Sequence, residues 1–256
     1  MGQRSGVRVT GVDAGRRGWV AVSLAAPSPA ALSRAALSLA ALSLAAPSPT
    51  AGGIAVTVRV AASLGALLAP DLDPAGTTIV GIDMPLGLLE TGWREADGAA
   101  RGLLGPRRSS VFAIPPRAVW AEASYPAANR RCRELTGQGF SMQAWGLRAK
   151  LLEANQYRQT CGHLMYEVHP ELAFGVMAGA PLAASKHTGP GRDERRRLLA
   201  RAGIEIPAGT LAALIGDVLD AAAVAWSTRR IAAGQAVTVP VVPQYDGQGA
   251  EIAIRF

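Results

Sequence analysis

The sequence is poor in the residues that build nitrogen and sulfur metal clusters. Its 256 residues include three histidines and only two cysteines, Cys132 and Cys161. The cysteines are not spaced as a CxxC pair, so they indicate reduced cytoplasmic thiols and argue against a disulfide framework or a zinc site. Any metal ion would therefore have to be held by carboxylates.

Lysine, aromatic residues and long apolar runs are also scarce. Lys occurs only at Lys150 and Lys186, against 24 Arg, and 50 residues are Ala, a usage typical of GC-rich bacterial genomes. Aromatic residues make up 5% of the chain, so the core has to be built from Ala, Val, Leu and Ile. No apolar run has the length of a membrane span, and the N-terminus enters a strand-like alternation directly. We therefore expect neither a membrane segment nor a secretory signal.

The basic residues are distributed unevenly. Between residues 91 and 160 there are 11 Lys and Arg against 5 Asp and Glu, a difference of +6 out of the net +7 of the chain. Such a segment beside a near-neutral body is typical of a polyanion-binding surface. It is equally typical of a solvated helical face in an Arg-rich protein, so charge alone leaves a nucleic-acid partner open.

The hydrophobic pattern predicts one α/β domain over residues 1–256. Residues 7–13 and 18–24 alternate apolar and polar side chains and predict an antiparallel hairpin. A third strand at 54–60 and a short helix lead to residues 77–83, a nearly all-apolar strand of the kind that is buried on both faces of a parallel sheet. Residues 25–50 repeat a five-residue AALSx unit that fits neither the helical nor the strand period, which predicts a low-complexity loop.

Residues 84–160 contain no clear strand and predict a basic, mostly helical insertion, with helices at 118–136 and 141–160. The remaining predicted elements are a strand, three helices and two strands, at residues 163–168, 170–179, 190–202, 210–233, 237–242 and 251–256.

Several of the 19 acidic residues end or interrupt apolar elements. Asp13, Asp83 and Glu167 each stand at the end of a predicted core strand, whereas Asp217 and Asp220 share one face of the last helix. A carboxylate in such a place is costly unless it is paired, hydrogen-bonded or metal-bound. Because parallel strands bring their carboxyl ends to one edge of a sheet, we expect these acids to converge there and to bind Mg²⁺ or Mn²⁺. Two such ions about 4 Å apart can activate a water and stabilise the leaving oxygen of a phosphodiester.

Each of these acids also has a purely structural explanation. Asp13 and Asp83 would accept hydrogen bonds from the turns that follow them. Asp217 lies near the start of its helix, where an acid offsets the macrodipole. Asp220 lies deeper in the apolar run, so it is the better candidate for the site, and Glu167 is favoured as a further ligand.

Basic and polar side chains are candidates for binding a phosphate ester. Arg107, Arg108 and Ser109 precede a VFAIPP turn, and their guanidinium and hydroxyl groups suit phosphate contacts. A solvated loop, or for the histidine a packed ring, is the alternative explanation. Weaker candidates of the same kind are Arg117, His169 and Lys186, whereas Gln143 would offer an amide, and Trp145 a stacking surface, to a base.

The element order, with acids on the first and fourth strands and on a late helix, resembles the RNase H-like fold. The chain is also similar to the domain of unknown function 429 family, whose members are predicted RNase H-like nucleases, over nearly its whole length except residues 25–50. The resemblance implies an RNase H-like mixed β-sheet with flanking helices and a helical insertion. It also implies that the acids named above, which lie in motifs shared with the family, are the acidic residues of the family's site. The motifs are GVDAGRRGWV, VGIDMPLGL, RRSSVFAIPPRA, SMQAW, YEVHPELAF, SKHTGPGRDERRRLL and DVLDAAAVAW.

The chain departs from the family pattern at two places. Members commonly have SKKT where this chain has Ser185, Lys186, His187 and Thr188. His187 would therefore contact phosphate only when protonated. Many members also have a second acid at the position of Gly216, and if that acid is a ligand, metal affinity is lower here.

These observations predict a cytoplasmic, metal-dependent nuclease or phosphodiesterase that acts on nucleic acid or a smaller phosphate ester. Asp13, Asp83, Glu167 and Asp220 would be catalytic and, with Asp217, would bind the metal. The first alternative is a non-catalytic nucleic-acid- or ligand-binding regulatory protein on the same fold. The second is an ATP-dependent phosphotransferase of the actin-like type, which needs a second related domain for which 256 residues leave little room. The oligomeric state stays open, a dimer included.

Overall fold

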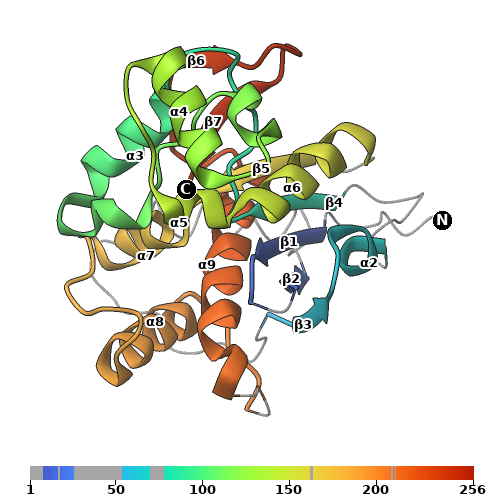
Figure 1. Cartoon of the computed structure of the whole chain (residues 1–256). Coiled ribbons are helices and arrows are strands. Elements are labelled where there is room, and N and C mark those ends of the chain that lie inside the picture. Colours follow the sequence, from blue (N-terminus) through green and yellow to red (C-terminus); the bar gives the residue numbers. More distant parts are fainter. Residues whose placement is uncertain are drawn as a thin grey trace.

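The computed structural model describes residues 8–16, 18–25, 54–69, 78–161, 164–208, 210 and 212–256. These residues form a seven-stranded mixed sheet with helices on both faces (Figure 1). The strands are β1 (Arg8–Asp13), β2 (Trp19–Ala25), β3 (Val56–Ala61), β4 (Thr78–Ile82), β5 (Leu164–Val168), β6 (Thr238–Tyr245) and β7 (Glu251–Arg255).

The helices flank this sheet, and none in the described part of the chain is long and apolar enough to cross a membrane. The α-helices are α2 (Leu64–Leu68), α3 (Glu95–Leu104), α4 (Tyr125–Thr136), α5 (Met142–Gly146), α6 (Arg148–Thr160), α7 (Pro170–Ala178), α8 (Gly189–Arg201) and α9 (Ile215–Ala232). The 3-10 helices are η2 (Gly105–Ser110), η3 (Arg117–Ala121) and η4 (Ala212–Leu214).

The strand order is β3-β2-β1-β4-β5-β7-β6. β1 and β2 form the expected antiparallel hairpin, whereas β1, β4, β5 and β7 are parallel neighbours. Every residue of β4 is buried, as its apolar sequence predicted. The carboxyl ends of the parallel strands therefore reach one edge of the sheet, and the mixed α/β architecture is confirmed.

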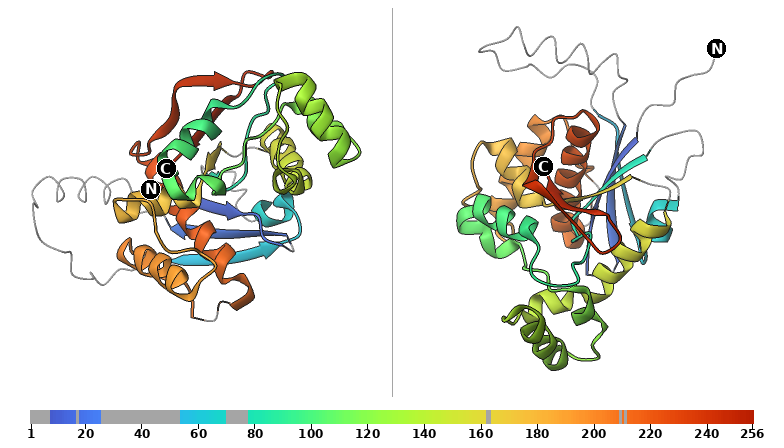
Figure 2. Two further views of the ribbon diagram at one scale, coloured as in Figure 1. Left: turned by 60° about the vertical axis from the view of Figure 1, so that its left-hand side comes forward. Right: turned by 90° about the horizontal axis from the view of Figure 1, so that it is seen from above.

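Different helices cover the two faces of the sheet. In the right-hand view of Figure 2 the orange helices α8 and α9 lie on one side, and α2 and α6 lie on the other. Val9, from β1, packs with α7, α8 and α9, whereas Val12, from the same strand, packs with α2 and α6. This alternation is the two-residue period of a β-strand, and it also decides to which face each strand-end acid points.

Helix α9 lies close to the central strands because two paired glycines leave room for it. A Cβ on Gly11 would lie 2.1 Å from the Ala225 nitrogen, and one on Gly81 would lie 2.1 Å from Thr228 Oγ1. Gly11 and Gly81 are register partners in β1 and β4. The absence of a side chain on both partners thus allows α9, which carries Asp220, to lie against these strands.

In the segment 84–160, helices α4, α5 and α6 lie within the two predicted helical stretches and α3 is an additional helix, whereas residues 84–94 and 111–116 are not helical. α3 contacts α7, β6 and β7, so this part of the insertion packs on the sheet itself. Asn155 of α6 holds the loop after β4, because its Oδ1 accepts from Gly87 N at 2.8 Å and its Nδ2 donates to the Pro85 carbonyl at 2.9 Å. The predicted low-complexity loop at 25–50 lies, beyond Ala25, outside the described residues.

Candidate functional site

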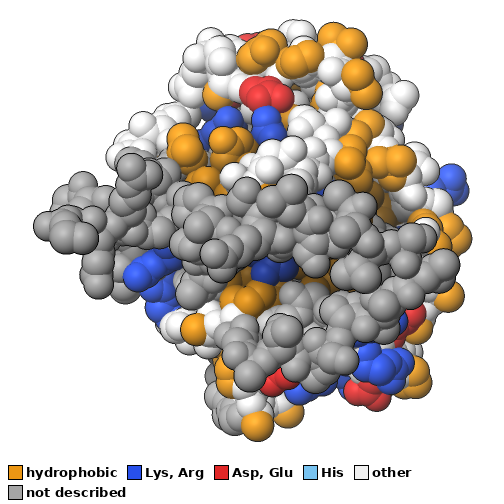
Figure 3. Space-filling view, turned by 180° about the vertical axis from the view of Figure 1, so that it is seen from behind, with side chains coloured by type: hydrophobic (Ala, Val, Ile, Leu, Met, Phe, Trp, Pro, Cys, Tyr) orange, Lys and Arg blue, Asp and Glu red, His pale blue; other side chains and the backbone are white. Residues whose placement is uncertain are grey.

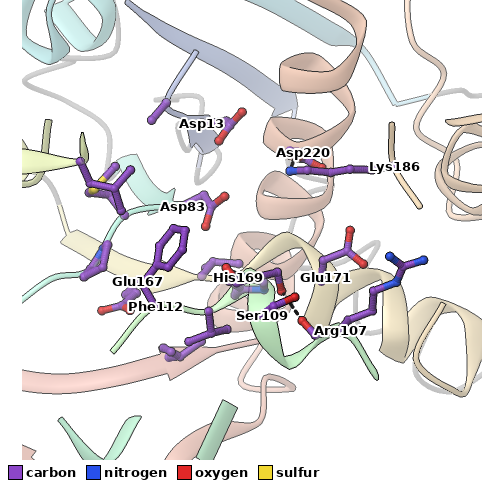
Figure 4. Close-up of a pocket in the computed structure, with 18 of the residues that line it drawn as sticks. Asp13, Asp83, Arg107, Ser109, Phe112, Glu167, His169, Glu171, Lys186 and Asp220 are labelled. Atoms are coloured by element: carbon purple, nitrogen blue, oxygen red, sulfur yellow. Dashed lines mark hydrogen bonds and ion pairs between the residues drawn. The ribbon is translucent and has the colours of Figure 1, made fainter. Parts of the chain in front are cut away.

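A cavity of about 520 Å³ lies at the carboxyl ends of β1, β4 and β5 (Figure 4). Its lining also includes parts of α9, of the loop between α7 and α8, and of the segment around η2. The strand-end acids therefore meet at one place, as expected from parallel pairing. The sequence-predicted residues that line it are Asp13, Asp83, Arg107, Ser109, Glu167, His169, Lys186, Asp217 and Asp220.

The centre of the cavity is a cluster of three aspartates, which we call the acid cluster: Asp13, Asp83 and Asp220. Asp13 follows Gly11 by two residues and Asp83 follows Gly81 by two, so both side chains leave the sheet on the α9 face. Asp13 and Asp83 line the same cavity and are close enough for the charge of Asp83 to raise the pKa of Asp13. Asp13 and Asp220 are only 7% and 3% exposed.

Burial and mutual repulsion disfavour the charged forms of the acid cluster. Burial, with Asp83 and Asp220 adding to it, raises the pKa of Asp13 well above its ordinary value. Burial also raises the pKa of Asp83 to about 7, although Lys186 opposes the shift. At neutral pH these carboxyl groups therefore need a proton or a cation between them.

Lys186 supplies one positive charge to the acid cluster. Its Nζ lies 2.6 Å from Asp220 Oδ2. Burial alone would lower the pKa of the Lys186 amine, but Asp220, Asp83 and Asp13 outweigh that effect and hold the pKa above its ordinary value. The second oxygen, Asp220 Oδ1, is buried and has no hydrogen-bond partner among the described residues.

Glu171 also lines the cavity, although nothing in the sequence distinguished it as a site residue. Both of its oxygens accept from Arg195 Nη2, at 2.6 and 2.9 Å, in a pair that is almost completely buried. Arg195 Nη1 donates to the Ala184 carbonyl at 3.2 Å as well. The pair therefore neutralises Glu171 and anchors the loop that carries Lys186. The sequence offered little indication of this role, because an acid in the first turn of a helix, such as Glu171, is common for structural reasons alone.

Glu167 lines the same cavity, but its carboxylate is engaged elsewhere. It pairs in register with Ile82, so it leaves the sheet on the face opposite to Asp13 and Asp83. There its Oε2 accepts from Arg94 Nη2 at 2.5 Å and from Leu86 N at 2.7 Å. Burial raises the pKa of Glu167 to about 7 against the effect of Arg94. The expectation of a metal-binding role for Glu167 stays a prediction, and these contacts give it a structural one.

The predicted substrate-binding residues divide into two groups. Ser109 lines the cavity, and so does Arg107, but Arg107 donates to the carbonyls of Leu182 (3.0 Å) and Ala183. Three others lie outside the cavity lining. Arg108 and Gln143 are exposed, and Arg117 pairs with Glu90 at 3.1 Å.

His169 borders the cavity as a packed ring. Its Nε2 lies 3.3 Å from the Ser110 carbonyl, which can only accept, so Nε2 carries the proton. Burial lowers the pKa of the imidazole and favours its neutral form. Nδ1 is buried with no hydrogen-bond partner in the described part of the chain. This geometry supports the structural interpretation of His169.

The donor chemistry of the acid cluster fits a divalent cation. The carboxyl groups of Asp13 and Asp83 and the unpartnered Asp220 Oδ1 are oxygen donors of the kind that Mg²⁺ and Mn²⁺ prefer. Within the described ranges, however, no three His, Cys, Asp or Glu side chains form a group ready to hold a metal ion. The third carboxylate of the cluster is in contact with Lys186 instead.

The positive charges of the insertion are largely committed to contacts within the protein. Arg94 is paired with Glu167, and Arg148 Nε donates to the Trp120 carbonyl at 2.7 Å. Lys150 donates to the Gly15 carbonyl at 2.7 Å. On the face shown in Figure 3, the Lys and Arg side chains that grey atoms leave visible form separate groups and no continuous basic surface.

Comparison with known proteins gives one match. A family model described as "Protein of unknown function (DUF429)" matches residues 11–244, a range that includes all of the acid cluster. No curated protein and no solved structure matches the chain.

Proposed function

Since the chain belongs to the family of proteins of unknown function DUF429, we propose its function from the site: a Mg²⁺- or Mn²⁺-dependent phosphodiesterase of RNase H-like fold. The observation that carries the proposal is the meeting of Asp13, Asp83 and Asp220 in one cavity, from β1, β4 and α9. The fold assignment is supported by the antiparallel hairpin, the parallel strands β4 and β5, and an acid on each of β1, the end of β4 and the late helix.

The charge balance of the cavity favours a cation. Glu167 and Glu171 are paired with arginines, whereas the acid cluster has Lys186 as its one ion-pair partner among the described residues. A phosphate ester is an anion and would be repelled by the surplus negative charge. Asp13 and Asp83 would hold the cation and Asp220 would complete its shell; when bound, the ion activates a water and stabilises the leaving oxygen.

The remaining groups act on the proton and on the phosphate. Without a cation, burial raises the pKa of Asp83 to about 7, so cation binding near neutral pH would release a proton from this carboxyl group. The Lys186 ammonium and the Ser109 hydroxyl lie in the lining and would contact phosphate oxygens. Arg107 and Arg195 hold the loop on which Lys186 stands.

The alternative is a non-catalytic binding protein on the same fold. Two observations favour it: the described residues contain no ready group of three metal ligands, and Lys186 already contacts Asp220. Under this alternative the acid cluster would be a buried, lysine-neutralised structural feature, and the ligand would be bound without turnover.

A cleavage panel separates the two functions. Wild type, Asp83→Asn and the exposed-acid control Asp193→Asn would be incubated with Mn²⁺ or Mg²⁺. The substrates are single- and double-stranded DNA, RNA, an RNA–DNA hybrid, branched DNA and a chromogenic phosphodiester. We expect turnover by wild type and Asp193→Asn that is lost in Asp83→Asn. Equal background from all three proteins would contradict the hydrolase and favour the binding protein.

A further inference from the structure

The cavity has a second wall whose chemistry differs from that of the acid cluster. Phe112, Pro85 and Leu147 line it, and each is only partly buried, so apolar surface is exposed to the hollow. Figure 4 shows the Phe112 ring between Asp83 and Glu167. Phosphodiester hydrolysis by itself does not require an apolar wall. Ligand-binding sites, in contrast, commonly combine apolar walls with a few precisely placed polar groups.

The backbone segment that carries Phe112 is held in place by buried polar contacts. Two residues further on, Ile114 N donates to Asp97 Oδ2 at 2.9 Å. Asp97 is itself buried, with Oδ1 3.5 Å from Arg94 Nε. Phe112 also packs against the core on the α2 and α6 side of the sheet. A flat apolar face held in this way binds a planar ligand with little loss of conformational freedom.

We propose that Phe112 is the stacking surface for the base of a nucleoside phosphate whose phosphate lies at the acid cluster. The proposal rests on the proposed function for the position of the phosphate, and it adds the substrate class. Stacking on an aromatic ring is tolerant of base identity, because every base has a π-face. A nucleoside phosphate joins the two chemistries that the two walls offer: a planar ring and a cation-bound anion.

The size of the cavity and the charges around it favour a single nucleotide unit. A volume of about 520 Å³ is in the range of small-molecule sites, which is about 300–1,000 Å³. A base within a duplex is stacked on its neighbours and cannot reach such a pocket. The arginines and the lysine of the insertion that would contact a long backbone largely bind carbonyl and carboxylate groups of the protein. A free nucleotide or one unit of a single strand therefore fits best.

Calorimetric binding of AMP and of ribose 5-phosphate, both with Mn²⁺, tests the stacking surface. Both ligands carry the phosphate and only AMP carries a base. We expect wild type to bind AMP more tightly, and Phe112→Ala to weaken AMP binding by about 5- to 150-fold. Ribose 5-phosphate should bind both proteins equally. Phe112→Trp should retain AMP binding, and Tyr245→Ala, which removes a 55%-exposed aromatic ring outside the cavity lining, should change neither ligand.

The outcomes separate this inference from the proposed function. Equal losses for both ligands in Phe112→Ala, no loss for AMP, or no AMP binding by wild type would overturn the stacking surface, even if wild type hydrolyses phosphodiesters. Conversely, the expected binding pattern for AMP and ribose 5-phosphate without any turnover would support the nucleotide site and exclude the proposed hydrolase activity. Competition against AMP by a single-stranded but not by a duplex oligonucleotide would identify a strand unit as the ligand. Competition by neither would identify the free nucleotide.

Discussion

Lys186 Nζ and Asp220 Oδ2 lie 2.6 Å apart, joining the loop between α7 and α8 to the first half of α9. The two partners differ in exposure, because the Lys186 side chain is 40% exposed and that of Asp220 only 4%. The carboxylate is thus held inside the protein by a cation that reaches in from the rim. A divalent ion at Asp13 and Asp83 would compete with this ammonium for Asp220.

Lys186→Met should destabilise the metal-free protein, because it leaves a buried carboxylate without its cation. We expect a loss of about 1–3 kcal/mol in the free energy of unfolding, between the values for exposed and buried pairs. Mn²⁺ should raise the melting temperature of Lys186→Met more than that of wild type. Urea unfolding of Lys186→Met, of Asp220→Asn and of the double variant gives the coupling free energy between Lys186 and Asp220. Additive losses would show that the pair does not stabilise the fold.

Stability should depend on pH through the raised pKa of Asp83. An acid with a higher pKa when folded binds its proton more tightly in the folded state. Its contribution is therefore present below the unfolded pKa of about 3.9 and is lost as the pH rises through the folded value of about 7. With a chelator present, the free energy of unfolding should fall between pH 4 and 7. Asp13 and Glu167 contribute to the fall as well, because burial raises the pKa of Asp13 well above its ordinary value and that of Glu167 to about 7.

Asp83→Asn is the control for that pH profile, because an amide does not titrate. Its unfolding free energy should fall less steeply with pH than that of wild type and should keep the part that belongs to Glu167. Parallel profiles for the two proteins would mean that Asp83 titrates near its ordinary value.

Alanine substitutions at two glycines should change the stability of the protein in opposite directions, because one glycine is closely packed against α9 and the other is not. Gly11→Ala would place a Cβ 2.1 Å from a backbone nitrogen of α9, so we expect a loss of at least about 2–3 kcal/mol. Gly216, on the same helix, has no atom within 4 Å of its built Cβ. Gly216→Ala should therefore be neutral or stabilising by up to about 1 kcal/mol. Thermal unfolding of both variants checks this, and similar melting temperatures would contradict the packing described above.

Breaking the Arg195–Glu171 pair should be more damaging than breaking the Lys186–Asp220 pair, because both partners are buried. Arg195→Met leaves an uncompensated carboxylate, and we expect a loss of about 3–5 kcal/mol. Adding Glu171→Gln should recover part of it. Faster amide exchange around Ser185 in Arg195→Met would show that the loop has lost its anchor; a loss no larger than that of Lys186→Met would argue against a buried pair.

The sheet was largely predictable from the sequence, because its strands alternate cleanly or are fully apolar. The convergence of Asp13 and Asp83 followed from the parallel direction of β1 and β4, whereas Asp220 joins them through the packing of α9 on these strands. Helix α3 was not singled out, since Gly98 and Gly102 interrupt its helical pattern.

The partners of the site residues were not predictable. Arg94 and Glu167 are 73 residues apart, and only the folded chain brings them together. The face on which Glu167 leaves the sheet depends on its register with β4, which no local pattern encodes. Arg107 looked suited to phosphate, but its nearest acceptors are two carbonyls from a distant loop. Phe112 carried no signal, because a single aromatic residue in a Pro-rich segment is usually part of the core.

Direct binding of Mn²⁺ without substrate tests the central claim, that the acid cluster is a divalent-cation site. Electron paramagnetic resonance titrations would compare wild type, Asp83→Asn and the exposed-acid control Asp193→Asn. We expect wild type and Asp193→Asn to bind Mn²⁺ equally, with affinity rising as the pH passes 7, and Asp83→Asn to bind at least tenfold more weakly. Equal Mn²⁺ binding by Asp83→Asn and wild type would place the cation elsewhere, and no binding by wild type would leave the acid cluster a buried, lysine-neutralised part of the fold.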